Sequence, residues 1–143
     1  MSIISKYNDR FNKYVIKLIN IAESTGSIDS SVILSVKQKI KQLNDINPLM
    51  IIQLLGKYLY DNDEYITNKD EKFLVSFTDK EYLKKKILEY DIPHNRSDID
   101  FVYNIVSSVY GDWTKYDEEQ KNIIFKIFQI MLSEYCKYLN HTT

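Results

Sequence analysis

Residues 117–140 carry the strongest periodic pattern of apolar positions in the chain. Apolar side chains recur there at steps of three and four residues, the spacing of one face of an α-helix. They are Ile124, Ile127, Phe128, Met131, Tyr135 and Leu139. Ile123, Ile130 and Leu132 make this stripe wider than that of an ordinary surface helix. We therefore expect a central amphipathic helix that other helices surround.

The start of this helix is predicted at Asp117. Its carboxylate can cap the first turn, and Gln120, three residues on, can bond back to the backbone N–H of Asp117. Helical patterns also cover roughly residues 3–23, 30–45, 78–90 and 97–110, each with one apolar face. The predicted fold class is therefore all-α, a single bundle of about six helices.

Residues 48–60, PLMIIQLLGKYLY, are almost continuously apolar and are expected to cross the core beside the final helix. Pro48 suits the first turn of this helix, because its missing N–H would have no partner there anyway. Gly56 costs a helix about 1 kcal/mol relative to alanine. Its presence indicates that another helix packs closely over it.

The helical pattern weakens in residues 61–77, where acidic residues alternate with aromatic and aliphatic ones. One interpretation is a short helix or an ordered loop, pinned to the core by Phe73 and Phe77. The other is a protein-binding surface, because interfaces draw their energy from a few aromatic anchors in a polar rim. The predicted partner-binding residues are Tyr60, Tyr65 and Phe73.

The chain holds 12 tyrosines, and tyrosine is favoured at interfaces because it buries a ring while its hydroxyl stays available for hydrogen bonds. Core packing with the hydroxyl at the surface is the alternative for each of them. If the partner does not bind at residues 58–77, the outer tyrosines Tyr116 and Tyr138 are the next candidates.

Length and composition fit one helical domain over residues 1–143. The net charge of -1 argues against nucleic-acid binding, which normally needs a basic face. Lys126, Gln129 and Glu134 interrupt the last apolar stripe, so no membrane insertion is expected. The N-terminus lacks the apolar run of a signal peptide, so secretion is not expected.

No catalytic or ligand-binding motif is readable in the sequence. The two histidines, His94 and His141, and the one cysteine, Cys136, have the spacing of neither a metal site nor a nucleophile with its base. Three glycines are too few for a phosphate-binding loop. We therefore expect no catalytic residue, no metal and no cofactor. An enzyme whose site is assembled from Tyr, Asp and Lys is the competing class.

Residues 47–74 and 113–129 resemble a family of small uncharacterised helical proteins encoded by giant nucleocytoplasmic DNA viruses. In that family a proline-led apolar helix leads to an Asp-Glu-Lys/Asn-Phe element, which residues 70–73 match. A tryptophan then precedes a terminal helix with an early lysine, as Trp113 and Lys121 do here. With the gap between them, the two stretches span a little over half of the chain. It implies a viral protein and no particular activity.

Residues 90–113 and the last helix resemble the closing helices of the poxviral Bcl-2-like proteins, which are short intracellular helical bundles. The Asn-Trp-Gly-Arg element of that family is absent, because Gly111, Asp112 and Trp113 stand in a different order. Members of the family act without catalysis, by binding host signalling or apoptotic proteins.

These observations predict a non-enzymatic protein–protein interaction module of a large DNA virus, present in the host cytoplasm or in the virion. The expected partner is a protein, either viral or host. The alternative that the second resemblance implies is a poxviral Bcl-2-like inhibitor of host apoptosis or of NF-κB signalling.

Overall fold

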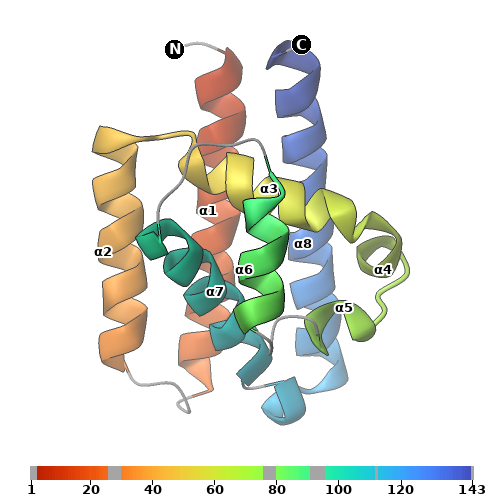
Figure 1. Ribbon diagram of the computed structural model, residues 1–143. Helices are drawn as coiled ribbons and strands as arrows, with labels where there is room; N and C mark the ends of the chain where they lie inside the picture. Colours follow the sequence, from red (N-terminus) through yellow and green to blue (C-terminus); the bar gives the residue numbers. More distant parts are fainter. Residues whose placement is uncertain (1–2, 26–29, 76–79, 91–95, 112, 143) are drawn as a thin grey trace.

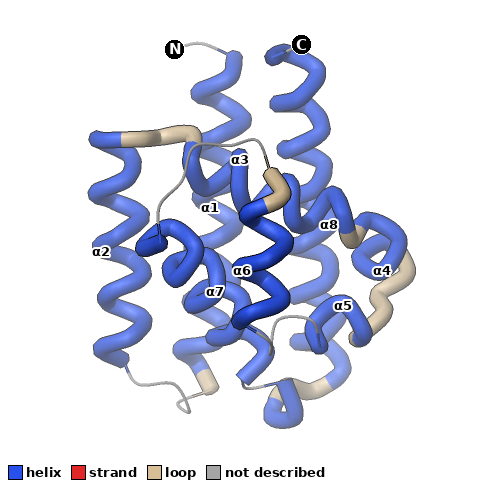
Figure 2. The backbone as a smooth tube through the Cα atoms, in the orientation of Figure 1, coloured by secondary structure: helices blue, strands red, loops and turns tan. Residues whose placement is uncertain are grey.

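The computed structural model describes residues 3–25, 30–75, 80–90, 96–111 and 113–142. Over these residues the chain forms eight α-helices, a short 3-10 helix and no strand, so the all-α prediction is confirmed (Figure 2). The helices are α1 (Ile3–Ser24), α2 (Ser30–Ile46), α3 (Met50–Asp61), α4 (Asp63–Thr67), α5 (Lys72–Val75), α6 (Lys80–Leu88), α7 (Arg96–Gly111) and α8 (Glu118–Thr142).

The number of helices exceeds the predicted six because residues 61–75 form two short helices, α4 and α5. Lys69 between them has a φ of 54°, in the left-handed region, which reverses the chain after α4. Pro48 is also placed differently from the prediction. It lies in a turn that the N–H of Met50 closes on the carbonyl of Asn47, at 3.2 Å, and α3 begins only after that turn.

The two longest helices, α1 and α8, lie side by side and run in opposite directions (Figure 1). They share the largest interface of any helix pair among the described residues. The ends of this pair are joined by Tyr7 and His141, whose rings stack at 5.4 Å. The start of α1 and the end of α8 therefore lie at the same end of the molecule.

The helix α3 crosses the α1–α8 pair and contacts both helices as well as α6 and α7 (Figure 1). Most of its side chains are buried, as its continuous apolar sequence predicts. The expected close approach at Gly56 is confirmed, because the ring of Tyr135 on α8 occupies the space where a side chain would begin.

The start of α8 has the predicted capping box. The backbone N–H of Gln120 donates to Oδ1 of Asp117 at 2.8 Å, and the N–H of Asp117 donates to Oε1 of Gln120 at 3.0 Å. A 3-10 helix, Trp113–Lys115, leads into this cap, so Trp113 lies in the connection between α7 and α8. Its buried ring packs against Phe125 of α8 at 5.7 Å, edge to face.

Some predicted features fall outside the described residues. These are the start of a helix at residue 78, the side chain of Phe77 and the loop histidine His94.

Candidate functional site

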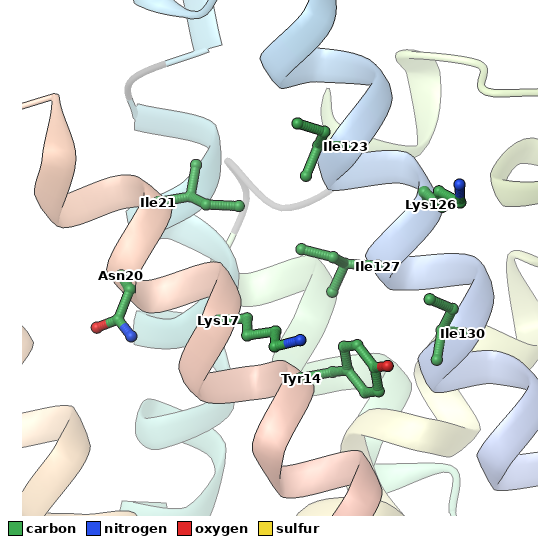
Figure 3. Close-up of a pocket in the computed structure, with 8 residues that line it drawn as sticks. All are labelled: Tyr14, Lys17, Asn20, Ile21, Ile123, Lys126, Ile127 and Ile130. Carbon is green, nitrogen blue, oxygen red and sulfur yellow. The ribbon is translucent and has the colours of Figure 1, made fainter.

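An open groove of about 440 Å³ lies between α1 and α8 (Figure 3). Its two walls are the facing sides of α1 and α8. The lining residues are Tyr14, Lys17, Asn20 and Ile21 from α1 and Ile123, Lys126, Ile127 and Ile130 from α8. The antiparallel arrangement places Tyr14 opposite Ile130 at one end and Ile21 opposite Ile123 at the other.

The floor of the groove is built from isoleucines, of which all but Ile127 are partly or largely exposed. Ile127 is buried between the helices, whereas Ile123 is 44% exposed. Ile130 and Ile21 are partly buried. The expectation that other helices cover the whole stripe of α8 is therefore wrong at Ile123, because α1 covers only one side of this stretch of α8.

The charged residues of the groove are lysines. Nζ of Lys17 lies 4.7 Å above the centre of the Tyr14 ring, a cation–π distance. Lys126 stands on the opposite rim and is exposed. No carboxylate lines the groove, and within the described part of the chain neither lysine forms an ion pair. The groove is thus apolar at its floor and positive at its rim.

The sequence signal for this groove was the excess width of the apolar stripe at Ile123 and Ile130. Sequence reasoning missed the groove, because an apolar residue beside the main stripe of a helix can equally well be covered by a neighbour. Whether these residues are covered depends on how α1 and α8, which are far apart in the sequence, are placed relative to one another.

The three predicted partner-binding aromatics do not form one surface. Tyr60, in the last turn of α3, is 46% exposed, and Tyr65, on α4, is 42% exposed. Phe73 is completely buried on α5, which confirms the interpretation that pins it to the core, and its exposure on a partner-binding surface is wrong. Its ring packs edge to face against Phe128 of α8 at 5.3 Å, because the short helix α5 points an apolar side chain into the core.

Tyr60 and Phe73 contact α8 at different places along its axis. The ring of Tyr60 contacts Tyr135 at 6.1 Å, and Tyr135 lies two helical turns beyond Phe128, roughly 10 Å along the axis. The outer tyrosines proposed as the alternative, Tyr116 and Tyr138, are buried at 4% and 5% exposure. This expectation is also wrong, because both rings pack into aromatic contacts with neighbours on α8 and the 3-10 helix.

One cluster does bring together a lysine, an aspartate and a tyrosine. Nζ of Lys57 lies 3.2 Å from Oδ1 of Asp61, and the hydroxyl of Tyr90 donates to Oδ2 of Asp61 at 2.9 Å. Burial raises the pKa of Tyr90 far above its ordinary value, and the hydrogen bond to Asp61 raises it further. Tyr90 therefore keeps its proton near neutral pH, and the cluster ties the end of α3 to Tyr90, the second residue after α6.

Cys136 and His141 have the surroundings of structural groups. Cys136 is partly buried on α8, and burial, with a smaller contribution from the charge of Asp63, raises the pKa of its thiol. A raised pKa reduces the thiolate fraction, which is the nucleophilic form. His141 is exposed, and its ring stacks on Tyr7.

In the described residues, no three His, Cys, Asp or Glu side chains gather closely enough to hold a metal ion. Within the same ranges, no helix has both the length and the apolar character needed to cross a bilayer. Comparison with protein-family models, with curated proteins and with solved structures found no match to this chain.

Proposed function

We propose that this chain is a non-enzymatic protein–protein interaction module and that the groove between α1 and α8 binds its partner. The observation that carries the proposal is the partly uncovered apolar floor of the groove, where Ile123 is 44% exposed. An apolar stripe that a globular protein leaves open, rimmed by polar groups, is typical of a binding site.

The energetic reason is the apolar surface that a partner would remove from water. Burial contributes roughly 25 cal/mol for each Å² of apolar surface. The part of an isoleucine that folding leaves exposed can therefore still contribute to the free energy of binding when a partner covers it. Ile123 and Ile130 are the isoleucines of α8 that folding leaves partly exposed, whereas Ile127 between them is already buried by α1. These residues are the expected centre of the interface.

The chemistry of the cluster of Lys57, Asp61 and Tyr90 argues against catalysis there. A catalytic tyrosine needs a pKa close to the working pH, whereas Tyr90 has its pKa raised by burial and by Asp61. Both carboxylate oxygens of Asp61 already have partners within the protein. This cluster is therefore explained by its structural link between α3 and the end of α6.

Tyr60 and Tyr65 form the second candidate surface for a partner. Both rings are exposed, and Nζ of Lys57 lies 5.4 Å from the centre of the Tyr60 ring. This surface lies over α3 and α4, whereas the groove lies between α1 and α8. The two surfaces can therefore be tested by separate substitutions.

The viral setting is part of the proposal and rests on the two sequence resemblances. A partner from the host apoptotic or innate-signalling machinery would support the Bcl-2-like alternative. Partners limited to viral structural proteins would support a role in the virion.

The experiment is affinity capture from infected-cell and uninfected host-cell lysates with three forms of the protein. They are the wild type, Ile123→Glu and a matched control, Leu34→Glu. Leu34 is an exposed apolar residue on α2, 56% accessible, so its substitution introduces the same charge away from the groove. We expect Ile123→Glu to lose a partner that the wild type and Leu34→Glu retain.

Two outcomes would overturn the proposal. One is identical capture by all three forms, which would exclude the groove as the binding site. The other is turnover in a panel of hydrolase and transferase assays that a single substitution abolishes, which would make the protein an enzyme.

A further inference from the structure

We infer that the element that binds in the α1–α8 groove is a short amphipathic helix carrying acidic side chains beside its apolar stripe. This inference rests on the proposed function and specifies the partner. Three properties of the groove carry it: its length, its exposure and the sign of its rim charges.

The length of the groove matches a short helix. Its lining runs over residues 14–21 of α1 and 123–130 of α8, eight residues on each side. Eight helical residues cover about two turns, roughly 10 Å. A helix docked along this length would place apolar side chains at positions i, i+3 or i+4, and i+7 against the isoleucines of the floor.

The exposure of the groove favours a helix over a small apolar ligand. Sites for small molecules normally bury most of the surface of the ligand. Of the lining residues only Ile127 is buried, while Lys17, Asn20, Ile123 and Lys126 are exposed. A small ligand would remain largely in water here, whereas a helix brings its own polar face to cover the opening.

The positive charges on the rim indicate that the partner carries negative charges. Lys17 on α1 and Lys126 on α8 flank the apolar floor from opposite sides (Figure 3). A glutamate or aspartate on each edge of the stripe of the partner would meet one lysine, and complementary rim charges increase the association rate and select the partner.

The same charges argue against a second copy of this chain as the occupant. A two-fold dimer brings one surface patch against itself. Such a dimer would bring Lys17 and Lys126 against the same lysines of the other copy, with no carboxylate in the groove to neutralise them. A two-fold dimer through the groove is therefore disfavoured, and we expect the negative charge to come from a different protein.

The test uses two synthetic helical peptides and fluorescence anisotropy. One peptide has leucine at i, i+3, i+4 and i+7 with glutamates flanking the stripe, and the other has lysines in place of those glutamates. We expect the wild type to bind the acidic peptide at least about tenfold more tightly than the basic one. In Lys17→Glu/Lys126→Glu the preference should reverse. Added salt should weaken the acidic complex of the wild type.

The matched control is Lys41→Glu/Lys85→Glu, which makes the same change in net charge at exposed lysines of α2 and α6. This variant should keep the preference of the wild type for the acidic peptide. Ile123→Glu should lose both peptides while remaining folded, because its side chain already reaches solvent.

The outcomes separate this inference from the proposed function. Suppose that Ile123→Glu loses its lysate partner, so that the groove remains the binding site. The acidic helix is then wrong if neither peptide binds the wild type, or if Lys17→Glu/Lys126→Glu keeps the peptide preference of the wild type. A concentration-dependent dimer of the wild type that Ile123→Glu dissociates would also overturn the inference, in favour of a second copy. If Ile123→Glu affects neither the lysate partner nor the peptides, both proposals fail.

Discussion

Tyr135 on α8 fills the space above Gly56 on α3. A Cβ atom added to Gly56 would lie 2.7 Å from Cγ and 2.9 Å from Cε1 of the Tyr135 ring, distances that packed carbon atoms do not reach. The two helices can cross this closely only because residue 56 has no side chain.

Gly56→Ala should therefore destabilise the protein. Alanine favours a helix by about 1 kcal/mol over glycine, but overpacking against a buried ring typically costs about 1–3 kcal/mol. We expect the free energy of unfolding, measured by urea denaturation, to fall. In a Tyr135→Leu background the same substitution should cost less, because the ring is gone. A rise in stability for Gly56→Ala alone would contradict the observed packing.

Phe128→Asp should prevent folding. Phe128 is buried, and its ring contacts Phe73, so an aspartate at this position would place an unpaired charge in the core. Lys126→Asp introduces the same residue two positions earlier on an exposed face and should fold normally. Circular dichroism distinguishes them: equal stability of the two variants would mean that α8 is not a core element.

Asp117→Ala should destabilise the start of α8. It removes the carboxylate that accepts the N–H of Gln120 in the capping box, a loss that typically costs about 1 kcal/mol. Glu119→Ala, at an exposed position in the first turn, is the control and should cost less. Thermal unfolding of both variants checks the prediction, which fails if the two melting temperatures fall equally.

Stability should decrease at alkaline pH through two tyrosines. Burial raises the pKa of Tyr135 to about 12, and burial and Asp61 raise that of Tyr90, each from an ordinary value of 10.0. The unfolded chain therefore loses these protons first. The contribution to stability is fully present below pH 10 and decreases as the pH rises above it.

The measurement is urea unfolding at pH 8 and pH 11. The wild type should lose stability between these values, and Tyr90→Phe/Tyr135→Phe should lose less of it. The control is Tyr65→Phe, at an exposed ring, which should behave like the wild type. An unchanged pH dependence in the double variant would show that other groups cause the alkaline loss.

Tyr60→Ala with Tyr65→Ala tests the second candidate surface. Because both rings are nearly half exposed, we expect the melting temperature to stay within a few degrees of the wild type. Reduced partner capture by this variant would place an interface over α3 and α4. Unfolding would instead identify the two rings as core residues, and full capture would leave the groove as the candidate interface.

The features that the sequence predicted well depend on nearby residues. The cap of α8 is set by Asp117 and Gln120, three positions apart, and the close approach at Gly56 follows from one glycine in an apolar helix. The predictions for individual tyrosines did less well, because tyrosine suits both a core and an interface. Residue type alone therefore did not reveal that Tyr116 and Tyr138 are buried while Tyr60 and Tyr65 are exposed.

Buried polar residues were also hidden from sequence patterns. Asn8 and Asn12 on α1 are 3% and 5% exposed, although both interrupt its apolar face. Their burial depends on how α1 packs against its neighbours, as does the groove beside Ile123. Features that arise between elements distant in the sequence were those that the periodicity of one helix could not predict.

The pairing of α1 with α8 sets the order of events when the chain is synthesised. The helix α1 leaves the ribosome well before its main partner, α8, which begins only at Glu118. At about 5–20 residues per second, the intervening chain takes roughly 5–20 s to make. During this interval α2, α3 and α7 can already cover part of the apolar face of α1, but the side that packs against α8 has no native partner. A nascent-chain chaperone is expected to engage that side until α8 emerges.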